Sequence, residues 1–391
     1  MPDNPMITHP LLRLGRLSLG PGLRGLTPGS KESGLLATAA VTVPDSPTSQ
    51  SYAWDVAWAD AAREAGQLGA EPATAQALER GAGAAATGGA RVVVAAHGEV
   101  ALSWSPLSGV DANWVRVGPL PHLLEVADDA ARRPAYVVVL ADRDGTDIIA
   151  HGAGDQAQAR RFEVGDRPGL QPDPHPGRPP AQPHGERHLT DREPESGGQR
   201  NDEFIAARLA EAANSVDAHV VLGAGDQHIL DAVAAYLPET IGPVTAIVGG
   251  RAADGRDDHL GAAIKVALAG ITSAAIGAVG DLVASLADGP DPAAVRGIKA
   301  VAEQLAEQQV AVLLVAADLA RDADADSNYR IGSRPAEFLV GESDIGVEVP
   351  LEDGLVWSAV HQDAIVVQLP DRLGPLGGEA VAALLRRGVA G

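Results

Sequence analysis

The spacing of apolar residues in the first third of the chain predicts strands and helices in alternation. Short runs of Ala, Val and Leu bounded by Gly or Pro are typical of strands, whereas apolar residues three or four positions apart are typical of helices that bury one face. Trp54 and Trp58 lie one helical turn apart and are expected to pack in a core. The pattern predicts a strand at 35–43, a helical stretch at 52–80 with a break near Pro72, a hairpin of 91–96 and 100–104 around His97 and Gly98, and a helix at 123–133 that ends before Pro134.

The alternation continues through the middle of the chain on both sides of a long segment without apolar periodicity. Strands and helices in alternation indicate a parallel or mixed sheet covered by helices. The expected elements are a hairpin of 136–141 and 147–151 around Asp144 and Gly145, a strand at 158–164, a helix after Gln199, a strand at 219–222, a turn at 223–226, a helix at 228–236 and a strand at 244–248.

The last third predicts another α/β unit. An Ala-rich helical stretch at 260–286 contains four glycines, which weaken the prediction of a single helix. The further elements expected are a helix at 292–308, a strand at 310–316, an irregular acidic segment at 321–356, a strand at 360–369 and a terminal helix at 378–387. The chain is therefore predicted to be an α/β protein of three domains, each a mixed sheet with flanking helices.

The segment from Gly165 to Glu195 is rich in proline and cannot form a helix or a central strand. Loops of this length in compact domains are uncommon and are usually functional or disordered, and we expect this one to be mobile until it is bound. It ends in Gly197-Gly198-Gln199, where glycine lets another backbone approach closely and glutamine offers donors and an acceptor without a titratable proton. An amphipathic helix is expected to follow, with Phe204, Ile205, Leu209 and Ala212 on its buried face.

Composition and charge limit the classes of function. The chain has 391 residues, enough for two to four domains, and it has no cysteine, which excludes disulfides and thiolate chemistry. No signal peptide and no apolar run of about eighteen residues is expected, so the cytoplasm is the default location. The net charge of −22 opposes broad electrostatic binding to nucleic acid, but residues 1–133 are nearly balanced, with 10 basic and 13 acidic residues.

Three other patterns suggest ligands but are incomplete. Gly223-Ala224-Gly225 after a strand is similar to the start of a nucleotide site, yet it lacks the third glycine and an acidic ribose partner, so a structural turn is the alternative. An acidic run at 322–328 has the alternate spacing of a calcium loop, but Ser333 stands where its bidentate glutamate would be. His175, His184 and His188 lack the carboxylate pattern of zinc hydrolases. We therefore expect no metal and no cofactor.

The order of elements around Gly197-Gly198-Gln199 resembles the middle domain of archaeo-eukaryotic peptide-chain release factors and their relative Pelota. A hairpin, a strand, a long loop ending in this tripeptide, a long helix and then Val220-Val221-Leu222-Gly223 follow one another in the family's order. Segments 295–301, 312–315 and 374–378 look like the family's third domain, and segments 117–121 and 132–137 look like its bacterial branch, which includes the hibernation factor Balon and its actinobacterial relatives.

The resemblance implies a domain plan and a site of action. It implies a tail at 1–33, an α/β domain on the decoding-centre side at 34–133, a middle domain with an RNase H-like fold at 134–250, and an L7Ae/L30e-like domain at 251–391. It also implies binding in the ribosomal A site, with the 165–200 loop directed to the peptidyl-transferase centre. The implied partners are the 70S ribosome with its rRNA, P-site tRNA, and a translational GTPase such as elongation factor Tu. The residues that would contact ribosomal RNA are Gly197, Gly198, Gln199, Arg200, Arg192 and Arg187.

Two functions stay open within this resemblance. Ribosome hibernation is the leading hypothesis, because the Asn-Ile-Lys-Ser motif with which release factors read stop codons is absent from this sequence. The alternative is hydrolysis of peptidyl-tRNA during ribosome rescue, in which Gln199 would be the catalytic residue that positions water. A nucleotide-dependent enzyme that uses Gly223 and Gly225 is a third hypothesis, from another class.

Overall fold

A computed structural model describes most of the chain. The described residues are 14–17, 21–30, 33–43, 50–83, 89–107, 110, 112–142, 145–153, 160–164, 195–238, 240–250, 258–287, 292–319, 328–332, 334, 337–341 and 345–388. They form two units: residues 1–134, 153–156 and 270–391 make up unit 1, and residues 135–152 and 157–269 make up unit 2. The α/β class and the multi-domain organisation predicted from the sequence are confirmed.

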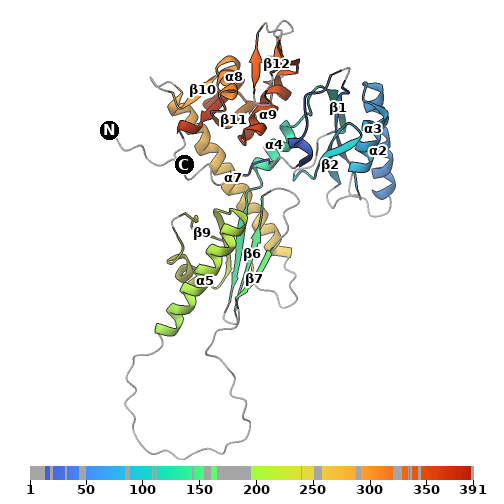
Figure 1. Cartoon of the computed structure of the whole chain (residues 1–391). Coiled ribbons are helices and arrows are strands. Elements are labelled where there is room, and N and C mark those ends of the chain that lie inside the picture. The colour runs from blue at the N-terminus through green and yellow to red at the C-terminus, as the bar shows by residue number, and fades with distance from the viewer. Residues whose placement is uncertain are drawn as a thin grey trace, which may run out of the picture. The chain divides into compact units, whose positions relative to one another are not determined.

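The first part of unit 1 is an antiparallel sheet with two helices on one face (Figure 1). The predicted break near Pro72 is confirmed, because α2 ends at Gln67 and α3 begins at Pro72. Trp54 and Trp58 are buried against this sheet with their rings edge to face, 5.9 Å apart. The elements are α1 (Pro21–Arg24), β1 (Leu36–Thr42), α2 (Gln50–Gln67), α3 (Pro72–Gly81), β2 (Ala90–Ala96), β3 (Glu99–Trp104), β4 (Trp114–Gly118) and α4 (Leu124–Ala131), with strand order β3-β2-β1-β4.

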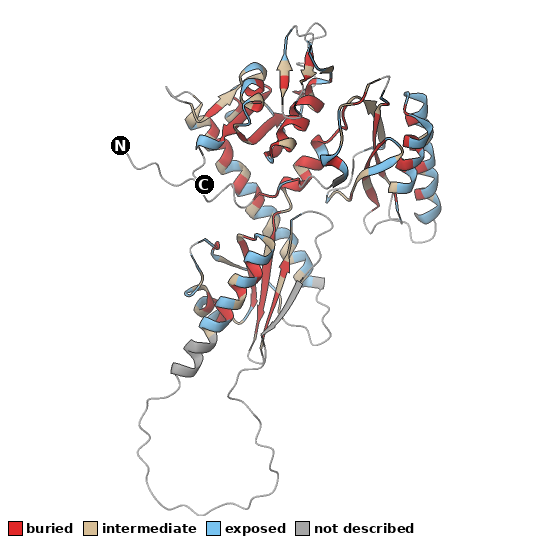
Figure 2. Cartoon of the chain, in the orientation of Figure 1, coloured by how far each residue is buried: buried red, intermediate tan, exposed pale blue. Residues whose placement is uncertain are grey.

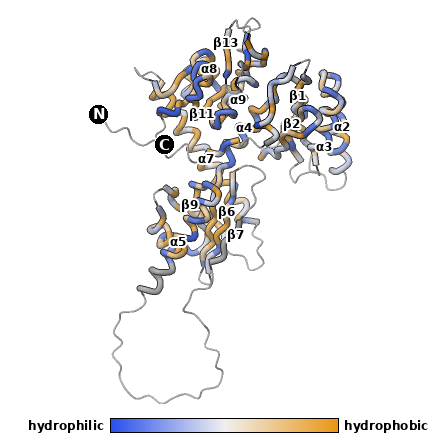
Figure 3. The backbone as a smooth tube through the Cα atoms, in the orientation of Figure 1, coloured by the Kyte–Doolittle hydropathy of each residue, from blue (hydrophilic) through white to orange (hydrophobic). Residues whose placement is uncertain are grey.

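The second part of unit 1 is a mixed sheet with a smaller antiparallel sheet. In the larger one, order β10-β16-β11-β15, only β11 and β15 pair in parallel; the smaller one has the order β13-β12-β14. Apolar residues concentrate along β11 (Figure 3). The elements are α7 (Asp258–Leu286), of which the residues from Gly270 onward belong to this unit, β10 (Ala294–Arg296), α8 (Ile298–Ala306), β11 (Val310–Ala316), β12 (Tyr329–Ile331), β13 (Phe338–Val340), β14 (Val347–Glu348), α9 (Leu351–His361), β15 (Ile365–Leu369), η3 (Gly374–Leu376), β16 (Val381–Leu385) and η4 (Arg386–Gly388).

Several expectations for this part were wrong. The terminal helix expected at 378–387 is the strand β16, which lies between β10 and β11 and is buried along its whole length. The helix expected from Pro292 begins only at Ile298, because residues 294–296 join the sheet and Gly297 turns the chain with a φ of 87°. The segment 321–356 contains strands and the start of α9, and α9 continues to His361, so the strand expected from Val360 begins at Ile365.

The helix α7 is uninterrupted despite its four glycines. By length and composition it could cross a membrane, with a mean hydropathy of 1.8 and 17% of its most apolar window buried. Only fifteen uncharged residues separate Lys265 from Asp281, so the expectation that the chain has no apolar run of about eighteen residues stays a prediction. Ala275, Val279 and Val283 of its second half are buried in one cluster with residues of β10 and β11.

Unit 2 is a five-stranded mixed sheet with a long helix against it (Figure 1). Its strand order is β7-β6-β5-β8-β9; β5, β6 and β7 pair antiparallel, whereas β8 pairs in parallel with both β5 and β9. Residues of β5, β6 and β8 are mostly buried, whereas much of the outer side of α5 is exposed (Figure 2). The elements are β5 (Tyr136–Ala141), β6 (Thr146–His151), β7 (Arg160–Val164), α5 (Glu195–Val216), β8 (Val220–Gly225), α6 (Gln227–Ala234) and β9 (Val244–Ala246).

Candidate functional site at the start of α5

The Gly-Gly-Gln tripeptide lies in the first turns of α5. This helix begins at Glu195, so Gly197, Gly198, Gln199 and Arg200 belong to it, whereas the sequence predicted that the helix would follow the tripeptide. The other positions named from the sequence, Arg187, Arg192, His175, His184, His188 and the acidic positions 322, 324 and 326, lie outside the described residues, as does the whole of 165–194.

The remainder of α5 is fixed against the sheet of unit 2. Ile205, Leu209 and Ala212 are buried in one cluster with residues of β5, β6 and β8. Phe204 is 55% exposed, so its predicted place on the buried face was wrong. Ala206 and Ala213 lie on the buried face instead. Each is three or four positions from Leu209, whereas position 204 is five positions from it and therefore falls on another side of the helix. The helix is therefore a rigid support for the residues at its start.

The tripeptide lies in the helix before the first packed residue that the structure describes. Among the residues of α5 with described burial, Ile205 is the first in the core cluster, six positions after Gln199. At the helical rise of 1.5 Å per residue, Gln199 lies about 9 Å further along the axis. The helix α5 thus joins the tripeptide directly to the packed residues from Ile205 onward.

The two chain ends that flank residues 165–194 are both directed to the same end of the sheet. Val164 is the last residue of β7 and pairs with Thr146, next to the carboxyl end of β5. Val216 ends α5 four residues before Val220 begins β8, so the start of α5 points to the carboxyl ends of β5 and β8. In open α/β sheets, ligand-binding residues gather at the carboxyl ends of the strands. The candidate site lies at this end.

The Gly223–Gly225 turn at this end has a structural role. An added Cβ on Gly223 would lie 2.7 Å from the Val244 Cγ1 atom, so close packing of β8 on β9 requires glycine. The Asp226 carboxylate accepts a hydrogen bond of 3.0 Å from the His228 amide and caps α6. Its negative charge occupies the place where a nucleotide phosphate would bind a helix N-terminus. The geometry therefore does not support a nucleotide site.

The described groups of unit 2 with shifted pKa values lie at the opposite end of the sheet. Tyr136 begins β5 and stacks on His151 of β6, with ring centroids 4.4 Å apart and an interplanar angle of 9°. Burial raises the pKa of Tyr136 and lowers that of His151, so both rings are held neutral. Among the described residues, therefore, these two offer no acid or base to the start of α5. Chemistry there would depend on positioning by the neutral amide of Gln199.

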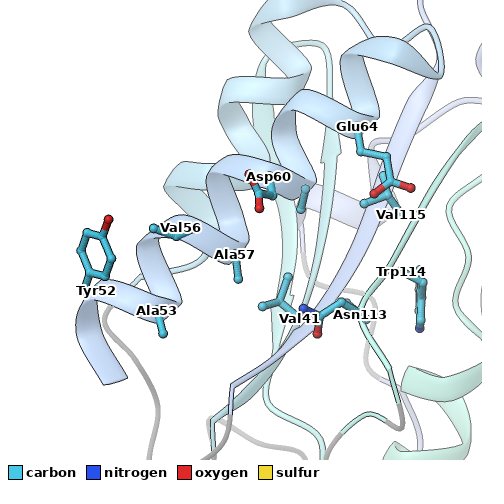
Figure 4. A pocket seen from close by; sticks show the side chains of 12 residues that line it. Val41, Tyr52, Ala53, Val56, Ala57, Asp60, Glu64, Asn113, Trp114 and Val115 are labelled. Atoms are coloured by element: carbon cyan, nitrogen blue, oxygen red, sulfur yellow. The ribbon is translucent and has the colours of Figure 1, made fainter. Parts of the chain in front are cut away.

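Unit 1 contains a pocket of about 540 Å³ between α2 and the strands β1 and β4 (Figure 4). Its walls are apolar, with Val41, Val56 and Val115 among the lining residues, and Asp60 and Glu64 add two carboxylates from α2. This pocket can hold an apolar group beside a positive charge. The sequence did not reveal it, because β4 follows α2 by more than forty residues and only folding brings Val115 beside α2.

The sequence also missed a buried group of His122, Glu352 and Asp353 in unit 1. His122 precedes α4, whereas the two acids lie in the first turn of α9. No short motif joins residues that far apart in the sequence, so no local signal could have identified the group.

Comparison with protein families gives one match, in the middle of the chain. Residues 135–288 match the family described as bacterial archaeo-eukaryotic release factor family 2. The first and third parts of the chain lie outside this match. No protein of curated function matches the sequence.

Solved structures of translation factors are similar to the chain at low identity. Archaeoglobus fulgidus Pelota has 16% identity, with 76% of this chain and 78% of that chain covered and a TM-score of 0.33. Ribosome-bound archaeal Pelota, solved with ABCE1, has 14% identity, coverages of 93% and 92%, and a TM-score of 0.38. Saccharomyces cerevisiae Dom34, described as a termination-like factor of RNA quality control that interacts with Hbs1, has 10% identity, coverages of 77% and 74%, and a TM-score of 0.35.

Proposed function

Because residues 135–288 match bacterial archaeo-eukaryotic release factor family 2, we propose that this protein is a translation factor that binds the ribosomal A site. The segment 165–200 would extend toward the peptidyl-transferase centre, and the domain at 34–133 would face the decoding centre. In its most specific form the proposal is a cytoplasmic hibernation factor, which occupies the ribosome without releasing a peptide.

The family match is the observation that carries the proposal. It confirms the resemblance to the bacterial branch of the release factor family over the middle of the chain, whereas the likeness to Balon stays a prediction. The tripeptide lies within this matched part, at the start of a helix that is fixed by its own buried face. A helix that is fixed by its packed face and has glycines in its first turns suits a probe that enters a crowded RNA site.

Charge is the main physical objection to ribosome binding. With a net charge of −22, the chain cannot rely on general attraction to RNA phosphates. The proposal therefore requires recognition by shape, with arginines at Arg187, Arg192 and Arg200 contacting phosphates locally. The near balance of charge over residues 1–133 is compatible with contact at the decoding centre.

A translational GTPase such as elongation factor Tu is proposed as the partner that delivers the protein. This rests on the family resemblance alone. Affinity capture from cells, with the ribosome and the GTPase quantified together, tests the point; recovery of ribosomes without any translational GTPase would remove the partner from the proposal.

Co-sedimentation tests whether the protein binds ribosomes. The purified chain is expected to migrate with 70S particles, and Arg187→Ala combined with Arg192→Ala is expected to weaken binding. Because two phosphate contacts are removed, the slope of the logarithm of the binding constant against the logarithm of the salt concentration should become shallower by about two. Arg63→Ala is the matched control, because Arg63 is 61% exposed and lies on α2 in unit 1. No migration with 70S particles at low salt would refute the proposal.

A peptide-release assay separates hibernation from the alternative, peptidyl-tRNA hydrolysis. Hibernation predicts that stalled ribosomes bind the protein and retain their peptide, and that Gln199→Ala leaves this unchanged. Hydrolysis predicts release that Gln199→Ala abolishes while binding is preserved. Gln67→Ala, an exposed position at the end of α2, controls for the loss of a surface glutamine.

A further inference from the structure

His122, Glu352 and Asp353 bring three metal-ligating side chains together inside unit 1. His122 is 4% exposed and Asp353 is 7% exposed, and Glu352 is partly buried beside them. Their ligand atoms all lie within 4.8 Å of one another. Buried charged side chains are found in proteins when they are paired or bind a metal. The partners of each charged atom in this group therefore decide its role.

A single ring nitrogen has to serve three partners in this group. The Nδ1 atom of His122 is 2.8 Å from Asp353 Oδ1, 3.1 Å from Glu352 Oε1 and 3.1 Å from Arg116 Nη1. A ring nitrogen either donates one hydrogen or accepts one. It cannot donate to both carboxylates, and while it donates to either one it cannot accept from Arg116. Each of these atoms has a partner, but one hydrogen on Nδ1 has to be shared between the two carboxylates.

We propose that His122, Glu352 and Asp353 bind a divalent transition-metal ion, with Zn²⁺ as the ion best suited to one imidazole and two carboxylates. The ligand atoms are His122 Nδ1, Glu352 Oε1 and Asp353 Oδ1. With metal–ligand bonds near 2.1 Å, neighbouring ligand atoms lie about 3.0 Å apart around an octahedral ion and about 3.4 Å apart around a tetrahedral one. The nitrogen–oxygen separations of 2.8 and 3.1 Å are close to the octahedral value, and a tetrahedral ion would need both to open slightly.

The surroundings of His122 hold its ring in place for this role. Its backbone amide donates a hydrogen bond of 3.0 Å to the Thr38 hydroxyl oxygen, and the Trp114 ring lies edge to face at 5.1 Å. A divalent ion at the three ligand atoms would lie between two carboxylates, whose negative charge it would neutralise.

Arg116 is the one described neighbour that opposes a cation. Its Nη1 atom is 3.7 Å from Glu352 Oε1, but its side chain is 55% exposed, so the guanidinium can turn outward to water. The ion would then join the segment before α4 to the start of α9, two elements of unit 1 that are 231 residues apart in the sequence. Closing so long a stretch of chain in the folded state would stabilise unit 1.

Zinc binding by the full-length protein tests the site. Protein stripped with a chelator is expected to take up one Zn²⁺ per chain and to unfold at a higher temperature when Zn²⁺ is added. His122→Asn and Glu352→Gln are expected to weaken Zn²⁺ binding by more than the ~10–100-fold typical of changes beyond the ligands themselves. His97→Asn is the matched control, because His97 is exposed and has a φ of 50°, which asparagine tolerates. Co²⁺ is expected to give a visible ligand-field spectrum that Glu352→Gln abolishes.

Arg116→Met distinguishes the metal site from a protonated His122 clamped by two carboxylates. A metal site predicts that this variant binds Zn²⁺ about tenfold or more tightly, because a competing positive charge is gone. A protonated His122 held between the two carboxylates predicts no Zn²⁺ uptake and a less stable Arg116→Met variant. Uptake that is equal in wild type and Glu352→Gln, or no uptake at all, would overturn the proposal. If His122→Asn does not fold, Glu352→Gln and Arg116→Met still decide the question.

Discussion

Gly225 and Ala141 approach each other so closely that no side chain fits between them. A Cβ atom on Gly225 would lie 1.9 Å from the Ala141 carbonyl oxygen, and the Gly225 φ of 113° is one that other residues rarely adopt. The next residue, Asp226, donates its amide to the same carbonyl at 2.8 Å. The carboxyl ends of β5 and β8, from which the candidate site is built, are fixed by this contact.

Gly225→Ala is therefore expected to destabilise unit 2 by roughly 3 kcal/mol, from backbone strain and steric overlap together. All five tryptophans belong to unit 1, so tryptophan fluorescence reports that unit alone, whereas circular dichroism reports both. The urea transition should move in circular dichroism and stay in place in fluorescence. Gly277→Ala is the control: it has open space around it within α7 and should stabilise by about 0.5–1 kcal/mol. Equal stability of wild type and Gly225→Ala would contradict the role of this contact.

Periodicity predicted the outer elements of the fold better than the fully buried ones. The hairpin around His97 and Gly98 was confirmed. Both residues have a positive φ, which a tight two-residue turn requires, and glycine in such a turn is easily recognised in a sequence. β16 was mistaken for a helix, because Val381–Leu385 is apolar at every position and carries no period, and its Ala and Leu favour helix. Its place between β10 and β11 is a tertiary effect. The start of α9 was missed for the same reason, because that helix is buried on nearly all sides.

The candidate functional residues also differ in how far the sequence could predict them. The helix beside the tripeptide was predicted from adjacent residues, although it begins at Glu195 and includes the tripeptide, and the role of the tripeptide stays a prediction. The buried group of His122 and Asp353 was not, because its members come from two elements that only the folded chain brings together. The Gly223–Gly225 turn was recognised as a turn, and its glycines are now explained by contacts with Val244 and Ala141.

The packing of α5 can be tested with two substitutions five positions apart. Leu209→Ala removes a fully buried side chain and is expected to cost unit 2 about 3 kcal/mol. Phe204→Ala removes a larger side chain that is 55% exposed, and its cost should stay below about 1 kcal/mol. Urea unfolding by circular dichroism measures both. A larger loss for Phe204→Ala would restore the helix face first predicted from the sequence.

The stack of His151 on Tyr136 should make unit 2 sensitive to mildly acidic pH. Burial lowers the pKa of His151 below the 6.5 of an exposed histidine. The unfolded chain therefore binds more protons below about pH 6.5, and the stabilisation present above that pH is lost as the pH falls through the lower, folded pKa. His151→Phe keeps an aromatic ring on Tyr136 without a titrating group. Its stability should fall less than that of wild type between about pH 7 and pH 5, by up to about 1.4 kcal/mol per pH unit. Identical slopes in urea unfolding would refute this assignment.

Asp129 anchors the loop after β3 to α4 in unit 1. Its carboxylate accepts hydrogen bonds of 2.8 Å from both Trp104 Nε1 and the Leu107 amide, and it forms an ion pair with Arg133 at 2.7 Å. The Arg133 guanidinium lies over the Trp104 ring, 5.3 Å from its centroid. Two N–H donors and one guanidinium thus share a single carboxylate, on a residue that is 7% exposed.

Asp129→Ala is expected to lower the stability of unit 1 by about 3 kcal/mol, because it leaves Arg133 without its buried counter-charge and two N–H groups without acceptors. Asp129→Asn keeps the volume and one acceptor oxygen, so its loss should be about half as large. Trp104 lies in the network itself, so tryptophan fluorescence follows the transition directly. Asp60→Ala provides the contrast, because Asp60 and Arg63 are both about 60% exposed and their ion pair should contribute less than about 0.5 kcal/mol. If Asp129→Ala were as mild as Asp60→Ala, the loop after β3 would be held by packing alone, and the carboxylate would have no structural role in joining it to α4.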